Sequence, residues 1–326
     1  MKGKTEKGKM KRLAVALVCL TMLFMMSVAP QNAGEAVSNL GRASESELHD
    51  EHLIETHTSD GRLYLSGATV SPKTAWTYKS VKLTHGTKAL TADARLINGV
   101  TYVLVRSFIN EVAKMYVNYY PESRTLNVRG SGFEMDIIDG SSVIYANGRV
   151  IYLPTPSAIM SNGAMYAPLS SVARALSLTL TESANRAEAT LTGSVKPIKH
   201  GSSYYDADSV YWLSRIISSE SKGEPLLGQV AVGCVVLNRV KSPDYPNTIW
   251  GVIFDRKYGV QFSPVLNGTI YNTPSAASVI AAKICLESYT VSPEALFFLH
   301  PKLATSSWIP RNRDYLFTIA NHDFYA

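Results

Sequence analysis

Three Asn-Gly dipeptides constrain the fold of this chain more than any other feature of its sequence. They are Asn98-Gly99, Asn147-Gly148 and Asn162-Gly163. Asn and Gly both accept the positive φ angles of a two-residue hairpin turn, and short runs of β-forming residues flank each pair. Residues 81–193 are therefore predicted to form antiparallel hairpins.

The same region contains an internal repeat. The run NGVTY followed by VLVRSFINEVAKM is similar to NGAMY followed by APLSSVARALSL. Each copy is a hairpin that leads into a short amphipathic helix, and each closes with a strand, YPESRTLNV in the first and SANRAEATL in the second. The repeat predicts a small α+β domain of two half-repeats over residues 81–193.

After this domain the pattern changes from strands to helices. The run SVKPIKHGSS, within residues 194–205, is rich in turn-forming residues and predicts a linker. Residues 206–326 follow as a second domain, with apolar residues at helical spacing and aromatic, Gly- and Asn-rich loops between the helices. We therefore predict an α+β protein whose C-terminal domain is mostly helical.

Three helices are expected in the C-terminal domain. The first is capped by Asp208 or Ser209. The second covers residues 228–240 and is apolar on nearly every side, which predicts a buried central helix. The third covers residues 275–289, which are rich in alanine and begin after a Thr-Pro pair.

The chain begins with the features of an export signal. Residues 1–12 carry a net charge of +5, and a run of 17 apolar or small residues follows from Leu13 to Ala29. A basic segment, an apolar segment and nearby small residues are typical of a secretory signal peptide, here assigned to residues 1–33. An uncleaved membrane anchor is the alternative, since this run is at the short limit for a membrane span. We expect a secreted or cell-wall protein that contacts the membrane transiently through its signal sequence.

This segment accounts for most of the charge of the chain. The formal net charge is +6, from 32 Lys and Arg against 26 Asp and Glu, and removing the +5 of residues 1–33 leaves +1. A strongly basic mature protein would favour a nucleic-acid partner, whereas a nearly neutral one does not. No nucleic-acid partner is expected.

Residues 34–80 are polar and irregular, which predicts a linker or a loosely packed lead-in. They contain a cluster of metal-ligating residue types, His49, Asp50, Glu51, His52 and His57. Because no folded frame is predicted around the cluster, a solvated polar tail is the preferred interpretation. We expect neither a metal nor a cofactor in the protein.

Export leaves two cysteines, Cys234 and Cys285, each within an apolar, helix-like stretch. Buried free thiols are the first interpretation, and a disulfide between two packed helices is the alternative in an oxidising location. Neither cysteine has a histidine or basic neighbour that would lower its pKa, so neither is expected to be catalytic.

Two carboxylates lie at the end of the first C-terminal helix. Gly223 and Pro225 end this helix, so that Glu220 is in its last turn and Glu224 just beyond. Glutamates at helix ends are commonly solvated. Alternatively, apolar neighbours desolvate Glu220 and raise its pKa, which lets it hold a proton at neutral pH and donate it to a leaving oxygen. The spacing alone leaves both interpretations open.

The C-terminal domain contains four motifs in order: WLSRIISSESKGEPLLGQVAVGCVVLNRVKSPDYPNTIWGVIF, YGVQFSPVLNG, ALFFLHPKLATSSWIP and TIANHDFY. Together these motifs resemble the catalytic domain of the spore cortex-lytic (SleB-like) cell wall hydrolases. The resemblance covers residues 206–326 and implies a small, lysozyme-like fold that cleaves peptidoglycan between N-acetylmuramic acid and N-acetylglucosamine. Glu220 matches the first Glu of the family motif E-[SA]-[RK]-G-E-P, and the resemblance implies that it is the catalytic acid of a lytic transglycosylase. This reaction needs one carboxyl group, and the sequence offers no obvious partner for a two-carboxylate mechanism.

The resemblance also implies substrate-binding residues. Glu224 matches the second Glu of the motif; it orients the loop, binds substrate or serves as a structural salt-bridge partner. Gln261 and Phe262 match the family's QF pair, in which the amide would bind an N-acetyl group and the ring would pack on a sugar face.

Three further side chains are candidates for the substrate groove. Trp308 is either a stacking platform for a pyranose ring or part of the core. Asn238, on the apolar second helix, needs a partner if it is buried and would line the floor of the groove. His322 is either a site residue or a structural histidine.

Residues 81–193 resemble the copper amine oxidase N-terminal-like domain, an accessory module of exported bacterial proteins. Despite its name this module implies no copper chemistry, and His85 is the one histidine in the range. A binding or spacing role is expected. The usual spore enzymes of the family carry a different N-terminal module, so vegetative wall and spore cortex both remain open as substrates.

The main alternative is a non-catalytic cell-wall or spore-surface protein that only binds glycan. Retention of Glu220 disfavours it. A metal-dependent amidase or peptidase is also disfavoured, because the C-terminal domain contains no HExxH or comparable ligand set. A monomeric enzyme is expected, and whether its product is an anhydro sugar or a reducing end is left open.

Overall fold

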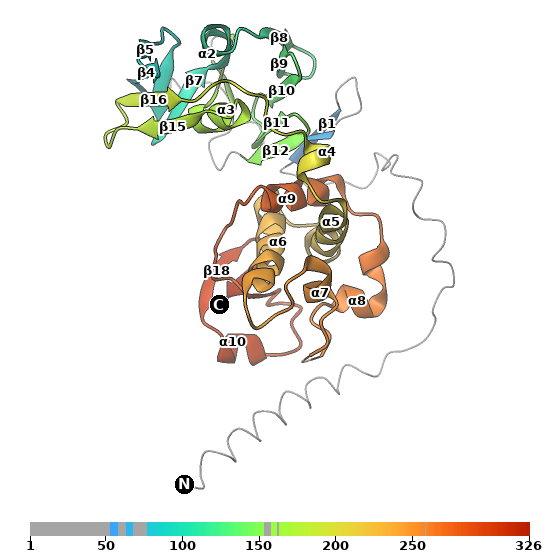
Figure 1. Ribbon diagram of the computed structural model, residues 1–326. Coiled ribbons are helices and arrows are strands. Elements are labelled where there is room, and N and C mark those ends of the chain that lie inside the picture. The colour runs from blue at the N-terminus through green and yellow to red at the C-terminus, as the bar shows by residue number, and fades with distance from the viewer. Residues whose placement is uncertain (1–52, 58–62, 68–76, 153–157, 162, 258) are drawn as a thin grey trace. The chain divides into compact units, whose positions relative to one another are not determined.

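The computed structural model describes residues 53–57, 63–67, 77–152, 158–161, 163–257 and 259–326 (Figure 1). The predicted signal peptide and the residues from His49 to His52 lie outside these ranges. The chain divides into two compact units. The β-rich unit comprises the described residues up to Ala207 with Leu286–Tyr289, and the helical unit comprises Asp208–Cys285 with Thr290–Ala326. In the described ranges, no helix has both the length and the apolar character needed to cross a membrane.

The described strands of the β-rich unit form three sheets besides one isolated hairpin. In pairing order, the first contains β12 (Arg149–Tyr152), β11 (Val143–Ala146), β10 (Phe133–Ile138), β9 (Thr125–Gly130) and β8 (Tyr116–Tyr120). The second contains β13 (Ile159–Ser161), β14 (Ala164–Pro168), β7 (Val100–Leu104), β6 (Ala94–Ile97) and β3 (Lys79–Ser80). The third contains β15 (Thr179–Glu182), β16 (Glu188–Thr192), β4 (Lys82–His85) and β5 (Lys88–Ala89). Neighbours pair antiparallel except β4 and β16, which are parallel.

The predicted half-repeats are confirmed. Hairpin β6–β7 leads directly into α2 (Val105–Val112), and hairpin β13–β14 leads into α3 (Leu169–Ala175). Asn98 and Gly99 have φ angles of 47° and 79°, as a two-residue hairpin turn requires. Each copy then ends in an antiparallel pair, β8–β9 in the first and β15–β16 in the second.

The β-rich unit has a hydrophobic core of its own. On α2 the buried residues are Val105, Phe108 and Ile109, which lie on one face of the helix. They share one cluster with Leu169 of α3 and Met135 of β10. Since each amphipathic helix covers strands from both halves, the unit buries a continuous core.

Two segments that the sequence predicts to be irregular contain regular structure. β1 (Leu53–His57) pairs antiparallel with β2 (Leu63–Gly67), so the prediction of an irregular lead-in over residues 34–80 is wrong at this point. α4 (Gly201–Tyr204) lies within the predicted linker. The Gly201 N–H donates to the carbonyl of Asn147 over 2.7 Å, which fastens α4 to the β11–β12 turn. Both contacts are made by backbone hydrogen bonds, which do not require a periodic pattern of apolar side chains, so the sequence did not predict them.

The helical unit contains α5 (Ala207–Ser221), α6 (Leu226–Lys241), α7 (Ile249–Ile253), α8 (Ser263–Asn267), η1 (Thr269–Tyr271), α9 (Ala276–Leu286) and α10 (Trp308–Asn312). A small antiparallel sheet follows the order β17 (Phe297–Leu299), β19 (His322–Tyr325) and β18 (Tyr315–Ile319). The three predicted helices are α5, α6 and α9. The expected cap at Asp208 or Ser209 is wrong, because α5 begins at Ala207 and Asp208 lies in its first turn, where the helix dipole favours a carboxylate.

α6 is the buried central helix of this unit (Figure 1). Its Gly233 is needed for close packing, because a Cβ atom there would lie 2.7 Å from Ile217 Cδ1 of α5 and 2.8 Å from Cys285 Sγ of α9. Cys234 and Cys285 are both buried and are not joined by a disulfide, with their sulfur atoms 4.0 Å apart. The structure thus has the buried thiols of the first interpretation.

Candidate active site

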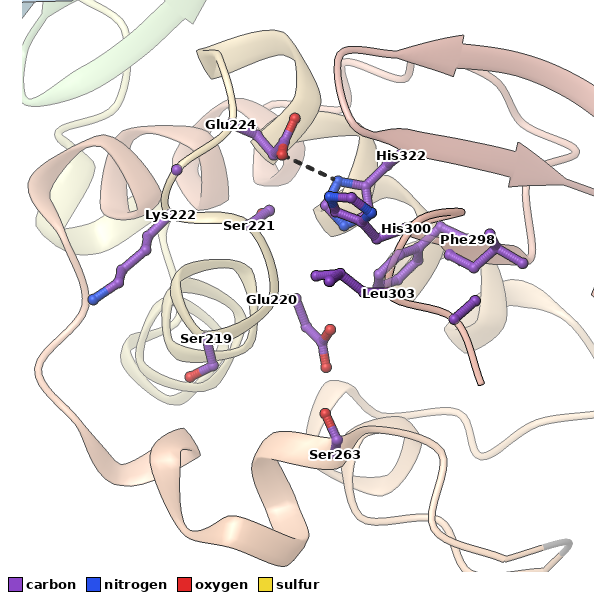
Figure 2. A pocket seen from close by; sticks show the side chains of 13 residues that line it. Ser219, Glu220, Ser221, Lys222, Glu224, Ser263, Phe298, His300, Leu303 and His322 are labelled. Atoms are coloured by element: carbon purple, nitrogen blue, oxygen red, sulfur yellow. Dashed lines mark ion pairs between the residues drawn. The ribbon is translucent and has the colours of Figure 1, made fainter. Parts of the chain in front are cut away.

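The last turn of α5 and the loop after it form one wall of a cavity of about 420 Å³. Glu220, Glu224 and His322 line this cavity, together with Ser263 at the start of α8 and His300 after β17. Figure 2 shows the Glu220 carboxylate pointing toward Ser263, whereas Glu224 points toward His322 on the opposite side. Helix α5 ends where the sequence predicts, at Ser221, so the two glutamates lie on either side of the helix end.

Burial raises the pKa of Glu220 to about 7, while the positive charge of Arg239 opposes this shift. A carboxyl group with this pKa is close to half protonated at neutral pH. It can therefore donate a proton and accept one back under the same conditions. Of the two interpretations that the spacing left open, the structure has the desolvated carboxyl group.

Arg239 of α6 is not part of the cavity lining but interacts electrostatically with Glu220. It is 5% exposed, and its Nε donates to the carbonyl of Leu296 over 2.8 Å. The rings of Phe262 and Phe297 lie 5.3 Å from its guanidinium carbon. Its Nη1 is buried without a hydrogen-bond partner among the described residues, so the charge of this side chain is only partly compensated. Burial accordingly lowers the pKa of Arg239, and Glu220 is one of the groups that oppose this shift.

Glu224 holds the turn between β18 and β19. Its carboxylate accepts the backbone N–H of Asn321 at 3.1 Å and the Asn321 side-chain amide at 3.0 Å. It also lies 3.6 Å from Nδ1 of His322. Both carboxylate oxygens therefore have partners in the protein, which fits the orienting role that was one of the expectations for Glu224.

His322 and His300 form a pair in the cavity, with ring centroids 5.7 Å apart. The Nδ1 atom of each ring is buried and has no hydrogen-bond partner among the described residues. Burial lowers the pKa of His322, although the Glu224 carboxylate opposes the shift. The two rings together present polar nitrogen atoms to the cavity.

The other predicted substrate-binding residues are not part of the cavity lining. Gln261 donates to the carbonyl of Gly259, and Phe262 is a buried side chain next to Phe298. Asn238 is buried and donates to two backbone carbonyls at 2.9 Å each, which satisfies its amide within the core. Trp308 is 37% exposed and lies edge-on to Phe297. The structure thus brings Glu220, Glu224 and His322 together and leaves these four outside the cavity.

Arg239 and His300 are site residues that the sequence analysis missed. A charged residue on a mostly apolar helix was the available signal for Arg239. His300 follows a short apolar strand, and nothing in its spacing relates it to Glu220. The described residues contain no group of three or more His, Cys, Asp or Glu side chains arranged to hold a metal ion.

Comparison with protein families supports both resemblances. Residues 223–325 match the model of the family described as Cell Wall Hydrolase, a range that begins three residues after Glu220. Residues 78–191 match the family described as Copper amine oxidase N-terminal domain.

Curated relatives match about a third of the chain. Spore cortex-lytic enzymes from Bacillus cereus and Bacillus subtilis are 39% and 36% identical to this chain over 105 residues. The matches cover 32% of this chain and 39% and 33% of those two proteins. The chain therefore spans little more than a third of the length of the curated relatives it matches.

Two solved structures are also similar. The catalytic domain of the germination-specific lytic transglycosylase SleB from Bacillus anthracis is 36% identical and is covered completely, by 40% of this chain, with a TM-score of 0.35. The catalytic domain of the Bacillus cereus SleB protein is 37% identical, with 92% of it covered by 37% of this chain and a TM-score of 0.34. By the family models, residues 223–325 are similar to cell wall hydrolase domains and residues 78–191 to copper amine oxidase N-terminal domains.

Proposed function

We propose that the helical unit cleaves the glycan strands of peptidoglycan as a lytic transglycosylase, with Glu220 as its single catalytic carboxyl group. The observation that carries the proposal is the position of Glu220 in the cavity, with burial raising its pKa to about 7. The names of the curated relatives, spore cortex-lytic enzymes, support a peptidoglycan substrate and favour the spore cortex over the vegetative wall.

In the first step the protonated Glu220 donates its proton to the glycosidic oxygen between N-acetylmuramic acid and N-acetylglucosamine. The bond from the muramic acid C1 to this oxygen breaks, and N-acetylglucosamine leaves with a free 4-hydroxyl group. Positive charge develops at C1. The Glu220 carboxylate formed in this step lies in the field of Arg239, which favours its charged form.

In the second step Glu220 acts as the base. Its carboxylate takes the proton of the muramic acid 6-hydroxyl group as that oxygen attacks C1, and a 1,6-anhydro ring closes. Glu220 is then protonated again, so one carboxyl group serves both steps. Glu224 lines the same cavity, but its two oxygens are engaged by Asn321, which supports a mechanism without a second free carboxylate.

A glycan-binding protein without catalytic activity is the second candidate. The polar nitrogen atoms of His300 and His322 in the cavity suit sugar binding in either case. The raised pKa of Glu220 favours catalysis, because a purely binding carboxylate gains nothing from desolvation. We further propose that the protein acts outside the membrane, in the cell wall or spore cortex, as a monomer that needs no cofactor.

Glu220→Gln tests the proposed function. The amide has nearly the same size and cannot supply a proton, so release of 1,6-anhydro-muropeptides from purified peptidoglycan should fall by roughly 10² to 10⁴-fold. Mass spectrometry of the soluble products measures the loss. Glu294→Gln is the matched control, since Glu294 is an exposed glutamate of the same unit, and it should keep wild-type activity.

Two outcomes would contradict the proposal. A Glu220→Gln protein as active as the wild type would exclude Glu220 as the acid. Wild-type products that end in reducing muramic acid would make the enzyme a hydrolytic muramidase. Digestion of vegetative sacculi and of spore cortex containing muramic δ-lactam, side by side, tests the choice of substrate.

A further inference from the structure

A second cluster of side chains lies in the helical unit outside the cavity. It consists of five aromatic residues, Tyr211, Trp212, Trp250, Phe254 and Tyr271, which we call the aromatic platform. They come from α5, α7 with the residue after it, and η1, all of which belong to the same unit. None of them is part of the cavity lining, and none has a role in the mechanism above.

The rings of the aromatic platform contact one another in a continuous series. Trp250 stacks on Phe254 with centroids 5.0 Å apart, and Phe254 meets Trp212 edge-on at 5.2 Å. Trp212 also contacts Tyr211 at 4.9 Å and Tyr271 at 6.3 Å. Because each ring is supported by a neighbour, the platform is held in place before any partner binds.

The outer rings of the platform face solvent. Trp250 is 55% exposed, Tyr271 61% and Tyr211 41%. Large aromatic side chains normally bury most of their surface, and a contiguous exposed group of them marks a binding surface. In addition, the Arg215 guanidinium lies 3.6 Å from the Tyr211 ring centroid, which adds a positive charge at one edge.

The platform is continuous with the candidate active site through α5 and η1. Ser219 lines the cavity next to Glu220, and its hydroxyl donates to the carbonyl of Thr269, the first residue of η1, over 3.0 Å. Tyr271 is the last residue of η1. Trp212 and Ser219 are seven residues apart on α5 and therefore lie on the same face of the helix, about 10 Å apart along its axis.

We propose that the aromatic platform is a remote binding site for the same glycan strand that is cut in the cavity, and that it holds sugars beyond the scissile bond. This inference rests on the proposed function. A glycan strand is a polymer and extends past a cavity of about 420 Å³ in both directions. Flat, exposed and mutually supported rings are suited to the C–H faces of pyranose rings, and Arg215 is suited to the carboxylates of the attached peptides.

The consequence is a preference for long strands. Sugars bound on the aromatic platform increase the affinity of the enzyme for a polymer. An oligomer that fills only the cavity does not gain this binding energy. The measured quantity is therefore a ratio, kcat/KM on polymeric peptidoglycan divided by kcat/KM on a soluble four-sugar muropeptide. A substitution that impairs Glu220 lowers both values equally and leaves the ratio unchanged. A change in the ratio therefore reports on the aromatic platform.

The experiment uses the full chain with Trp250→Leu and Tyr271→Leu, singly and together. Loss of one stacked ring should lower the ratio about tenfold, which corresponds to about 1.4 kcal/mol. Trp250→Phe keeps a flat ring, so its ratio should stay close to the wild-type value. Tyr315→Leu is the matched control, since Tyr315 is a tyrosine of the same unit with a similar exposure of 57% that lies on β18, and it should leave the ratio unchanged. Circular dichroism checks that each variant is folded.

A second measurement does not depend on the reaction. In the Glu220→Gln background, the pull-down of the protein on purified sacculi should weaken when Trp250 and Tyr271 are both replaced by leucine. If wild-type products were not anhydro sugars, the proposed mechanism would fail while this binding result still decided the role of the platform.

Three results would overturn the inference. One is an unchanged ratio and unchanged binding in the double variant. Another is an equal loss on polymer and oligomer, which would assign the residues to the stability of the unit. The third is a dimer in sedimentation velocity that the double variant abolishes, which would assign the platform to a second copy of the chain.

Discussion

At the scale of single residues, the carboxyl group of Glu220 is subject to two opposing influences. Burial at the end of α5 raises its pKa, and the positive charge of Arg239 limits the rise. The result, a pKa of about 7, suits a group that must give and take a proton in one catalytic cycle. The effect of burial can be tested by measuring stability at two pH values. The effect of Arg239 can be tested by measuring the pH profile of activity.

Glu220→Gln is expected to stabilise the helical unit at pH 8 and to leave its stability nearly unchanged at pH 4.5. The ordinary pKa of this group is 4.5 and its folded value is about 7, so ionisation is harder in the folded state. The wild type therefore loses stability as the pH rises from 4.5 to 7, and glutamine does not. The difference in unfolding free energy should reach about 1 to 3 kcal/mol above pH 7. Urea denaturation at the two pH values measures it, and an equal effect at both would contradict the raised pKa.

Arg239→Met is expected to move the falling, alkaline limb of the activity profile to higher pH. Without the positive charge of the Arg239 guanidinium, the carboxylate form of Glu220 is less favoured and the pKa of Glu220 rises further. The rate at alkaline pH should increase relative to the rate at pH 6. Arg311→Met, at an exposed arginine of the same unit, is the control and should leave the profile in place. A limb that does not move in a folded Arg239→Met protein would show that the guanidinium has no electrostatic effect on Glu220.

At the scale of elements, close backbone approaches decide which helices and turns can meet. Gly233 lets α5 and α9 pack on α6, and Gly201 lets α4 reach the β11–β12 turn. Glu224 has a similar effect by a different means, because its carboxylate ties the loop after α5 to the β18–β19 turn. The contacts of Gly233 and Glu224 belong to the unit that holds the cavity, although neither residue is expected to react with the substrate.

Gly201→Ala is expected to destabilise the β-rich unit by about 2 to 3 kcal/mol. A Cβ atom on residue 201 would lie 2.4 Å from the carbonyl oxygen of Gly148, and backbone atoms cannot rotate away as a side chain can. Ser203→Ala, at an exposed position of α4, is the control and should change stability by less than about 0.5 kcal/mol. Thermal unfolding followed by circular dichroism compares the two. A Gly201→Ala protein as stable as the control would mean that α4 does not dock on this turn.

At the scale of the whole molecule, the chain consists of two compact units with separate cores. The β-rich unit is built around α2 and α3, and the helical unit around α6. A unit that has its own core does not depend on the packing of the other unit for its stability. This arrangement fits the comparisons, in which different parts of the chain match different families.

Differential scanning calorimetry of the full chain is expected to show two unfolding transitions. Gly201→Ala should lower the temperature of one transition, and Glu220→Gln at pH 8 should raise that of the other, since the two residues belong to different units. A single transition that both variants shift would show that the units unfold as one cooperative block.

Local features of the sequence determined the regular elements of both units. The Asn-Gly pairs of residues 81–193 predict hairpin turns because they tolerate positive φ, and α6 is identifiable because a mostly apolar stretch must be buried. The order of motifs likewise singled out Glu220. The pairing of β1 with β2 and the docking of α4 left no such signal, because backbone hydrogen bonds form with little regard to side-chain type.

Distances between residues remote in the chain were decided by the tertiary structure. Arg239 within electrostatic range of Glu220, His300 beside His322 and Tyr271 beside Trp212 come from segments that no local pattern relates. The same holds for Asn238, whose amide is satisfied by carbonyls more than fifty residues away and not by the cavity. Desolvation and electrostatic interaction act through space, so the candidate proton donor, Glu220, was apparent from the sequence, while the surroundings that set its pKa arose only on folding.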